Sequence, residues 1–504
     1  MSDTQNLDNY WINYLKENDV IETEDEVSKS IRTDREKVIF LLNSVLSVFT
    51  SAVADENNYR GGEIPCFLKP FGSYGLGGYI RNADIDVVLI CSQLIKRRDF
   101  FRFFPDTLRQ LATIREIETI KNANVPIIKC VVDNISVDIS FVRLRENHCD
   151  KNMDLLDDRY LKDIHETCRA SLDGPRVNSF TKKQIRERHV YIFQRSLQCI
   201  KHWATRRQIY NKPIGYLNGS AWTLLLLKTY MDMRDTPNLS ITLLTCTFFN
   251  KWRDWAWPAP VLLTGEIPGG EHGRRIELRH LPEFQDAVMP IVTPCYPVSS
   301  AAPNVTKSTL KIMTREFERA AVILDDASTE PKETLKKLFN NIEYFKKYQN
   351  FMTIITSSTL QSSHETWQRK MPNVIPQFLQ MLEKSPDLRC IQPVTKPKLE
   401  SHNYRTNEER KALEMGMSVA EAKQLDLNGQ LNPGMVYLSF FFIGIQVESS
   451  CRFLNLSEQV DSFEKLLHSR RTKYDDDVRW HVTAFSRKKV KDIIFCNNRK
   501  HMAL

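Results

Sequence analysis

Residues 71–90 read FGSYGLGGYIRNADIDVVLI, a glycine-rich turn followed by two aspartates at the head of an apolar run. The β-branched residues after the aspartates indicate a buried strand. Side chains two residues apart in a strand point to the same face, so Asp84 and Asp86 are expected side by side. Two neighbouring carboxylates repel each other unless a cation neutralises them, and such hard oxygen ligands suit Mg²⁺ or Mn²⁺.

A third acid, Asp138, lies in another strand pattern, ISVDISF at 135–141. If the two strands are neighbours, three carboxylates converge. Such a trio can hold two metal ions about 3.5–4 Å apart, which clamp the attacking and leaving oxygens of an in-line phosphoryl displacement. Gly72 and Ser73 suit a triphosphate, because the glycine lets the backbone approach while the hydroxyl and N–H groups meet phosphate oxygens.

Less specific interpretations of these residues stay open at this point. A D-x-D pair on a strand is common and usually means exposed acids or a Ca²⁺ site. The glycines follow the order G-x-x-G-x-G, which differs from the dinucleotide fingerprint, and no G-K-[ST] follows as in a Walker loop. A zinc site at His165-x-x-Cys168, with His148 and Cys149 upstream, matches no structural ligand spacing, so packed or surface side chains are the better interpretation.

The composition is typical of a globular protein, with 504 residues, 42% of them hydrophobic and 26% charged, and the length implies two to four domains. The 11 cysteines form no C-x-x-C pair, which fits reduced thiols inside a cell. The apolar stretch 435–447 is too short to span a bilayer, and no signal peptide or heptad repeat is visible, so we expect a monomer without membrane association. The net charge of +8 permits a polyanionic partner.

Three regions follow from the pattern, and their boundaries are 1–180, 181–347 and 348–504. The first is mixed α and β, with helices predicted at 8–15 and 38–49 and strands at 84–91, 126–133 and 136–144. The second is mainly helical, with helices predicted at 190–203 and 220–231. The third predicts the strand–helix–strand order of a small RNA-recognition-like sandwich, with its elements at 351–356, 365–384, 435–447, 456–467 and 478–485. The polar span 396–432 is predicted to be a flexible insertion.

The order of G-S, D-x-D and a later aspartate resembles that of the DNA polymerase β-like nucleotidyltransferase superfamily. The surrounding sequence resembles the eukaryotic nuclear poly(A) polymerases of that superfamily. The resemblance is nearly complete up to residue 350 and weaker but collinear beyond it. Its motifs are FGSYGLG…ADID at 71–86, VPIIK at 125–129, RASLDG at 169–174, IKHWATR at 200–206, WPAPVLL at 257–263 and MPIVTPCYP at 289–297.

The resemblance implies an α+β multidomain enzyme, with N-terminal helices and a nucleotidyltransferase palm, a helical middle domain and a C-terminal RNA-binding domain. It implies that AMP from ATP is added to the 3′ end of RNA, with Asp84, Asp86 and Asp138 as metal ligands. The residues implied to contact ATP are Phe71, Gly72, Ser73, Val125, Lys201, Tyr210, Gly219 and Ser220. Lys129 is implied to lie beside the RNA, the nucleus is the implied location, and cleavage and polyadenylation proteins are the implied partners.

Several positions depart from the family pattern. Gly75 stands where the family has arginine, Lys212 where it has asparagine, and Asn218-Gly219-Ser220 where it has G-G-V. These positions lie where base and sugar are read, so the choice of ATP is less firmly implied than the catalysis. The cluster Arg487, Lys488 and Lys489 suits RNA phosphates or an ordinary solvated surface, and no aromatic RNP pattern predicts base stacking.

Competing functions stay open on the sequence. The nearest is a terminal uridylyltransferase, or another non-templated RNA nucleotidyltransferase, built on the same palm. A non-catalytic RNA-binding subunit with an inactive palm belongs to a different class, and the intact trio of aspartates argues against it. A Ca²⁺-binding module is the weakest alternative.

Overall fold

The computed structural model describes residues 2–21, 26–266, 277–326, 328–424, 430–472 and 475–495, and the chain divides into two compact units. The first unit consists of Met1–Ala204, Asn218–Ala301 and Glu318–Phe339, and the second of Thr205–Leu217, Ala302–Phe317 and Asn340–Leu504. The predicted middle region, 181–347, contributes to both units. The three domain boundaries expected from the sequence therefore stay a prediction.

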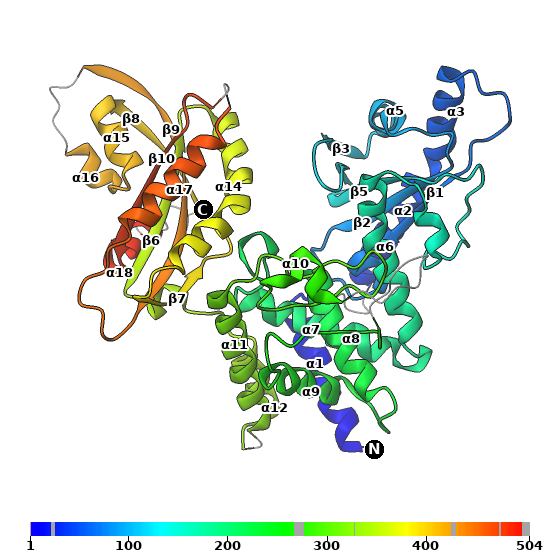
Figure 1. Cartoon of the computed structure of the whole chain (residues 1–504), viewed down its shortest axis with the longest axis horizontal. Coiled ribbons are helices and arrows are strands. Elements are labelled where there is room, and N and C mark those ends of the chain that lie inside the picture. Colours follow the sequence, from blue (N-terminus) through cyan, green and yellow to red (C-terminus); the bar gives the residue numbers. More distant parts are fainter. Residues whose placement is uncertain are drawn as a thin grey trace. The chain divides into compact units, whose positions relative to one another are not determined.

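The first unit is built on a five-stranded mixed sheet with the order β1-β2-β5-β4-β3 (Figure 1). Its strands are β1 (Cys66–Phe71), β2 (Ile85–Cys91), β3 (Ile114–Ile120), β4 (Ile127–Val132) and β5 (Ile135–Arg143). β2 and β5 pair in parallel, whereas the other neighbours pair antiparallel. The strand patterns around the three aspartates are thus confirmed as neighbours. β3 was not predicted from the sequence, because its exposed Arg115 and Glu116 break the apolar alternation.

Helices cover both faces of this sheet, because apolar side chains alternate along β2. Val87 and Leu89 belong to a core with α2 (Glu26–Ser44), α3 (Leu46–Glu56) and α5 (Arg97–Arg109). Val88 and Ile90 belong to a core on the opposite face with α6 (Glu166–Gln184). Burying both faces holds β2 in place, and the aspartates at its amino end are positioned by that packing.

Two further helices belong to the first predicted region, and those from α7 to α13 bear out the predicted helical character of the middle region. They are α1 (Ser2–Glu17), α4 (Gly72–Leu76), α7 (Val190–Arg206), α8 (Gly219–Met233), α9 (Ile241–Arg253), α10 (Pro282–Gln285), α11 (Lys307–Asp325), α12 (Pro331–Leu338) and α13 (Tyr344–Lys347). Short 3-10 turns lie at η1 (Asp158–Leu161), η2 (Glu187–His189), η3 (Lys212–Ile214) and η5 (Leu278–His280).

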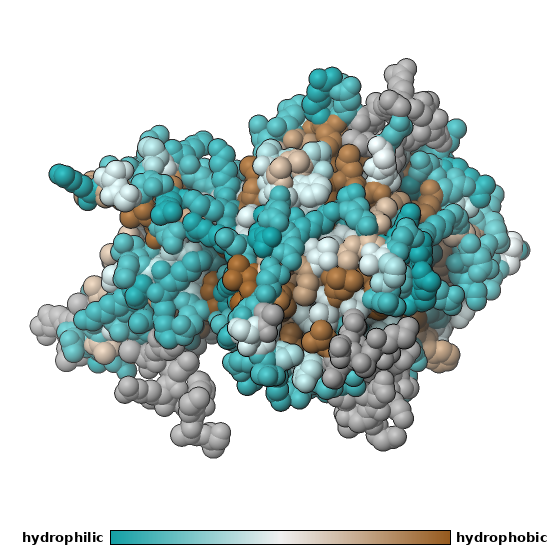
Figure 2. Space-filling view, turned by 90° about the horizontal axis from the view of Figure 1, so that it is seen from below, coloured by the Kyte–Doolittle hydropathy of each residue, from teal (hydrophilic) through white to brown (hydrophobic). Residues whose placement is uncertain are grey.

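The helical stretch Asp34–Glu56 is 23 residues long and, by length and composition alone, apolar enough to cross a bilayer. It covers the carboxyl-terminal part of α2 and all of α3, and the two helices break at Val45, where the sequence predicted one helix. Its residues Leu42, Phe49 and Val53 are fully buried in the core of the first unit. The apolar residues of this stretch therefore pack against the sheet of the first unit. In Figure 2 the visible face is mostly hydrophilic, and its apolar residues form small islands.

The second unit contains a five-stranded antiparallel sheet with the order β10-β6-β9-β7, and β8 also pairs with β9 (Figure 1). Its strands are β6 (Asn350–Ser358), β7 (Leu388–Pro393), β8 (Lys398–Thr406), β9 (Leu431–Val447) and β10 (Arg479–Ser486). Its helices are α14 (Gln361–Leu382), α15 (Asn407–Glu414), α16 (Val419–Lys423), α17 (Ser457–Ser469) and α18 (Arg487–Phe495). The predicted RNA-recognition-like order of strands and helices is confirmed.

Both faces of this second sheet are covered. α14 contacts β6 and β9, and Phe378 of α14 stacks on Phe463 of α17 with ring centroids 4.2 Å apart. On the other face, α15, α16 and α18 bury Leu413, Ala422 and Val490 in one core with strands β6 and β9.

The prediction of a flexible insertion at 396–432 is wrong for its described part. β8, α15 and α16 form there, and residues 425–429 lie outside the described residues. The segment is polar because one side of β8 is exposed, while Tyr404, Ala412 and Leu413 anchor it in the core. A half-exposed edge with few apolar residues gives too weak an alternation to be recognised from the sequence.

Candidate active site

The structure brings Asp84, Asp86 and Asp138 together. One carboxylate oxygen from each lies within 4.8 Å of those of the other two, and within the described ranges no other such group of three His, Cys, Asp or Glu side chains occurs. Asp86 is directly opposite Asp138 in the parallel register of β2 and β5, and Asp84 lies immediately before β2. Three carboxylates at this spacing provide the hard oxygen donors of a divalent metal site.

Gly72 is required by the approach of its backbone to Asp86. β1 ends at Phe71, which is opposite Asp86 in the antiparallel pairing with β2. Gly72 then turns into α4 with φ of +62°, and a Cβ at this position would lie 2.4 Å from Oδ2 of Asp86. Only glycine combines this left-handed backbone with so close an approach.

Burial, neighbouring carboxylates and two lysines act on the charges of the three aspartates. Burial, together with the charges of Asp84 and Asp138, raises the pKa of Asp86 to about 7. Lys129 of β4 forms an ion pair with Asp138, 2.7 Å from Nζ to Oδ2. Burial lowers the pKa of Lys201 to about 8, against the opposing effect of Asp86 and Asp84. Binding of a divalent cation is favoured by such a partly buried cluster of carboxylates, in which one carboxyl group has a raised pKa.

The loop between α4 and β2 is held from two sides. The buried guanidinium of Arg35, on α2, donates hydrogen bonds to the backbone oxygens of Arg81 and Ala83, both at 2.8 Å. Ala83 directly precedes Asp84. Arg35 therefore fixes the backbone from which the first carboxylate projects.

On the other side of this loop, α7 presents three polar side chains to its carbonyl groups. Gln194 donates to Leu76 O at 2.8 Å, Gln198 to Tyr79 O at 2.6 Å and Lys201 to Gly78 O at 3.3 Å. These residues are spaced as one face of a helix. Lys201 was predicted from the sequence, whereas the two glutamines were not. Polar residues that recur at helical spacing in an apolar helix could have indicated them.

The turn at α4 also contacts α6. Asn178 donates a hydrogen bond to Gly72 O at 2.9 Å, and a Cβ at Gly174 would lie 2.7 Å from the Phe71 ring. A Cβ at Gly75 would lie 2.9 Å from the backbone oxygen of Pro70 and 3.2 Å from Oδ1 of Asn178. The glycine that departs from the family pattern therefore stands at a position where a side chain has no room unless its neighbours shift.

The other residues expected at ATP are placed as follows. Ser73 follows Gly72 in α4 and is half-buried, and Val125 is half-buried just before β4. Gly219 and Ser220 begin α8, where Asn218 caps the helix by accepting the Ala221 N–H. α8 contacts α4. Tyr210 belongs to the second unit, where it forms a β-bridge with Leu217.

Three of the basic residues expected at RNA lie in the second unit, and two of them have partners there. Arg487 donates from Nε to Tyr348 O at 2.7 Å, and Lys489 pairs with Glu421 at 2.8 Å. Lys488 is exposed. A structural role is thus visible for Arg487 and Lys489, as the alternative interpretation of this cluster allowed.

The side chains weighed as a zinc site have structural partners. His165 caps α6 by accepting the Thr167 N–H at 3.2 Å. Cys168 and Cys149 are buried and accept or donate hydrogen bonds at the backbone of Arg143 and Pro65. The burial and hydrogen bonds of these two cysteines are those of packed side chains.

Comparisons with known proteins cover nearly the whole chain. Residues 3–184 match the family model of the poly(A) polymerase nucleotidyltransferase domain, residues 192–341 that of the poly(A) polymerase central domain, and residues 343–502 that of the poly(A) polymerase predicted RNA binding domain.

Among curated proteins, the poly(A) polymerase of Dictyostelium discoideum is 31% identical over 367 residues, which are 72% of this chain and 44% of that protein. The poly(A) polymerase pla1 of Schizosaccharomyces pombe is 28% identical over 414 residues, 82% of this chain and 71% of that protein. The chain thus spans less than half of the Dictyostelium relative. Among solved structures, the Cid1 poly(U) polymerase is 15% identical with a TM-score of 0.46, covering 68% of this chain and 100% of that one.

Proposed function

The chain belongs to the poly(A) polymerase family, a family of nucleotidyltransferases, and we propose that it is a template-independent polynucleotide adenylyltransferase. It adds AMP from ATP to the 3′ hydroxyl of RNA and releases pyrophosphate. The observation that carries this proposal is the convergence of Asp84, Asp86 and Asp138 at adjoining ends of two parallel strands.

The donor set fits a pair of divalent cations. Asp84, Asp86 and Asp138 would hold Mg²⁺ or Mn²⁺, which neutralises the phosphate charge and polarises the attacking and leaving oxygens. Three close carboxylates, one with its pKa raised to about 7, are the arrangement that such cations stabilise. The preference for these metals over Ca²⁺ remains part of the proposal.

The protein itself binds and orients the substrates. Gly72 brings its backbone against Asp86, and the N–H groups at the start of α4 with the Ser73 hydroxyl suit phosphate oxygens. Lys201 supplies a buried positive charge facing Asp84 and Asp86, suited to the triphosphate. Phe71, Val125, Tyr210, Gly219 and Ser220 are proposed to form the remainder of the ATP site. The reaction then depends on positioning and charge stabilisation.

Lys129 is proposed to contact RNA near the reacting hydroxyl, because its ammonium group is already beside Asp138. In the C-terminal RNA-binding domain, Arg487, Lys488 and Lys489 are proposed as phosphate contacts, with Lys488 the best exposed. We further propose domains at 1–180, 181–347 and 348–504, a monomeric state, a nuclear location and association with cleavage and polyadenylation proteins.

Extension of a labelled oligo(A) RNA by the purified chain, with Mg²⁺ or Mn²⁺ and each single NTP, tests the proposal. ATP is expected to give a ladder that Asp86→Ala abolishes. Asp106→Ala, which removes an exposed carboxylate paired with Arg109, is the matched control and should extend normally.

A ladder with UTP in place of ATP would overturn the substrate while retaining the site, and would support the uridylyltransferase alternative. The departures at Gly75, Lys212 and Ser220 would then be the positions to examine. Equal extension by wild type and Asp86→Ala would refute the catalytic site itself. Binding of RNA without extension under any condition would support the alternative of a non-catalytic subunit.

A further inference from the structure

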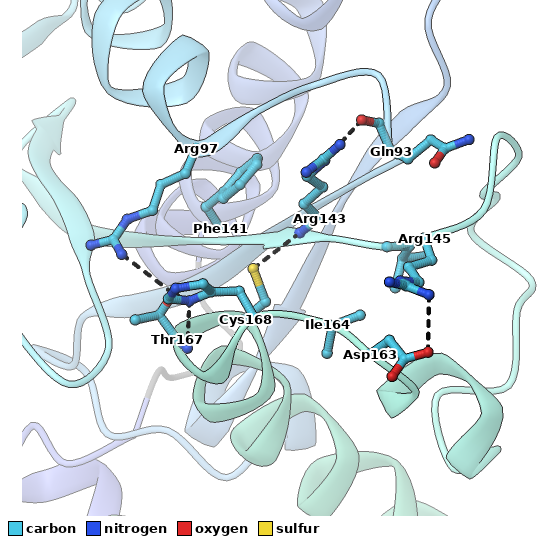
Figure 3. Close-up of a pocket in the computed structure, with 11 residues that line it drawn as sticks. Gln93, Arg97, Phe141, Arg143, Arg145, Asp163, Ile164, Thr167 and Cys168 are labelled. Atoms are coloured by element: carbon cyan, nitrogen blue, oxygen red, sulfur yellow. Dashed lines mark hydrogen bonds and ion pairs between the residues drawn. The ribbon is translucent and has the colours of Figure 1, made fainter.

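A cavity of about 790 Å³, drawn in Figure 3, lies in the first unit, and none of the three aspartates lines it. It is formed at the carboxyl ends of the parallel strands β2 and β5, whereas the aspartates lie toward their amino ends. Asp138 and Arg143 are five residues apart on β5, about 17 Å at ~3.3 Å per residue. The crevice at the carboxyl ends of neighbouring parallel strands is where open α/β sheets commonly bind ligands.

The cavity is strongly cationic. Arg97, Arg143 and Arg145 line it, and Asp163 is the one carboxylate among its lining residues. Figure 3 shows Arg97 at one end and the Arg145–Asp163 pair at the other, with Arg143 between them. The arginines come from three separate places in the fold, the start of α5, the end of β5 and the loop after it. The excess of positive charge therefore arises from the tertiary arrangement and selects an anion.

Each guanidinium is held by the surrounding structure with donors to spare. Arg97 donates to Lys121 O at 2.6 Å and to Thr167 Oγ1 at 3.4 Å, and Arg143 donates to Gln93 O at 2.8 Å. Arg145 pairs with Asp163 at 2.9 Å. A guanidinium carries five N–H donors, so these bonds leave most of them available. Fixed arginines with remaining donors are suited to bidentate contacts with phosphate.

Two helices add to the positive potential. α5 begins at Arg97 and α6 begins at Glu166, so the amino ends of a 13-residue and a 19-residue helix reach the cavity. A helix amino end carries about half a positive charge and favours phosphate groups. The helix ends reinforce the arginines and are not the basis of the site by themselves.

The cavity also has an apolar wall. Phe141, Leu144 and Ile164 line it and are buried. A cation-lined hollow with an apolar wall matches a ligand that carries a phosphate on an aromatic or apolar body. The volume of about 790 Å³ is in the range of small-molecule sites, and Arg143 and Arg145 are exposed, so that a ligand can reach them from solvent. We propose that this cavity is a second binding site, for a nucleoside phosphate or an organic phosphate of that size.

Equilibrium binding of labelled AMP to the full chain in EDTA tests this site without relying on catalysis. Wild type is expected to bind AMP, and Arg143→Gln and Arg97→Gln are each expected to weaken binding by at least about tenfold, because each removes charged hydrogen bonds to phosphate. Arg109→Gln removes an equal charge from the exposed surface of α5 and should bind as wild type does.

Hydrogen exchange of the same chain gives a second measurement that does not depend on the variants folding. AMP is expected to protect the backbone around Asp163 to Cys168. Absence of AMP binding, or binding that the arginine variants leave unchanged, would overturn the proposal. Binding of an oligonucleotide but not of AMP, weakened by Arg143→Gln, would replace it with an RNA-contacting surface.

Discussion

Single residues matter most in this protein where the backbone of one segment meets a carboxylate of the next. Gly72 is the clearest case, because its φ of +62° and the 2.4 Å approach of a virtual Cβ to Asp86 Oδ2 exclude any side chain. The glycine determines where Asp86 lies relative to the start of α4. It therefore links the backbone expected to meet the triphosphate to the carboxylates expected to hold the metal.

We expect Gly72→Ala to lower RNA extension by about 100-fold, since displacement of a reacting group by about 1 Å has an effect of this size. The chain should still fold, with a cost of about 1–2 kcal/mol for the left-handed backbone. Extension rates and thermal unfolding together check this. Gly265→Ala is the control, because a Cβ there meets nothing within 4 Å. Wild-type activity in Gly72→Ala would show that this approach is unimportant.

Elements position the site through the loop that precedes β2. Arg35 of α2 and the polar face of α7 hold the backbone oxygens of this loop from two sides. A helix on one side of a sheet thus contributes to the placement of Asp84 without touching a substrate. Arg35 is a positioning residue in this sense.

Arg35→Met should raise the Mn²⁺ concentration needed for half-maximal extension by about tenfold, as is typical when a group that orients a metal ligand is removed. Arg35→Lys, which retains the charge and a single donor nitrogen, should give an intermediate value. The measurement is extension against Mn²⁺ concentration at saturating ATP. Lys37→Met, on the exposed face of α2, is the control. A fall in stability with unchanged metal dependence would limit Arg35 to a structural role.

The packing of α14 on β9 includes a buried imidazole. His364 lies 2.8 Å from Ser439 Oγ through Nε2, and burial lowers its pKa below the usual 6.5. The unfolded chain therefore binds a proton at this residue more readily than the folded chain below pH 6.5. Its contribution to stability is present above that pH and is lost as the pH falls below it, through the lower pKa of the folded state.

We expect the urea midpoint of the wild type to fall between pH 7 and pH 5, and to fall less steeply in His364→Gln. Glutamine retains a hydrogen bond to Ser439 but does not titrate. Unfolding curves at three pH values measure the slope. His148→Gln, which replaces an exposed imidazole, serves as the control. Identical slopes for wild type and His364→Gln would show that titration of His364 does not cause the loss of stability at low pH.

At the scale of the whole molecule, the second unit is assembled from three separated segments of the chain. Arg207 of the first segment forms a buried ion pair with Glu316 of the second, 2.8 Å from Nε to Oε2, and both side chains are 8% exposed. The same guanidinium donates to the backbone and side-chain oxygens of Asn340 in the third segment at 2.9 and 2.8 Å. One arginine therefore connects all three.

Glu316→Gln should destabilise the chain by about 3–5 kcal/mol, because it leaves the Arg207 charge buried without its counter-ion. The double variant Arg207→Met, Glu316→Leu should recover part of this loss. Glu333→Gln breaks an exposed pair with Lys336 and should change stability by less than about 1 kcal/mol. Chemical unfolding of the four proteins compares them, and equal effects of Glu316→Gln and Glu333→Gln would refute the role of the buried pair.

Much of the site was accessible from consecutive residues. The two-residue period of a strand placed Asp84 and Asp86 on one face, and glycine followed by serine indicated a close backbone approach. The polar edge strand β3 and the segment 396–432 were missed or misjudged, because half-exposed strands have little apolar alternation. Arg35, Gln194 and Gln198 were missed because their partners are backbone oxygens more than forty residues away.

Three features could be read from residues that are neighbours in the chain. They are the periodicity of side chains, the turn at Gly72 and the family to which the chain belongs. The register that sets Asp86 opposite Asp138 could not be read in this way, because it depends on how β2 packs between helices on both faces. The same holds for the cluster of Arg97, Arg143 and Arg145, whose positive charges meet only when the start of α5 packs beside the end of β5 and the loop after it. Contacts between distant residues are selected by the packing of the whole core, and that packing created both the carboxylate trio and the cationic cavity.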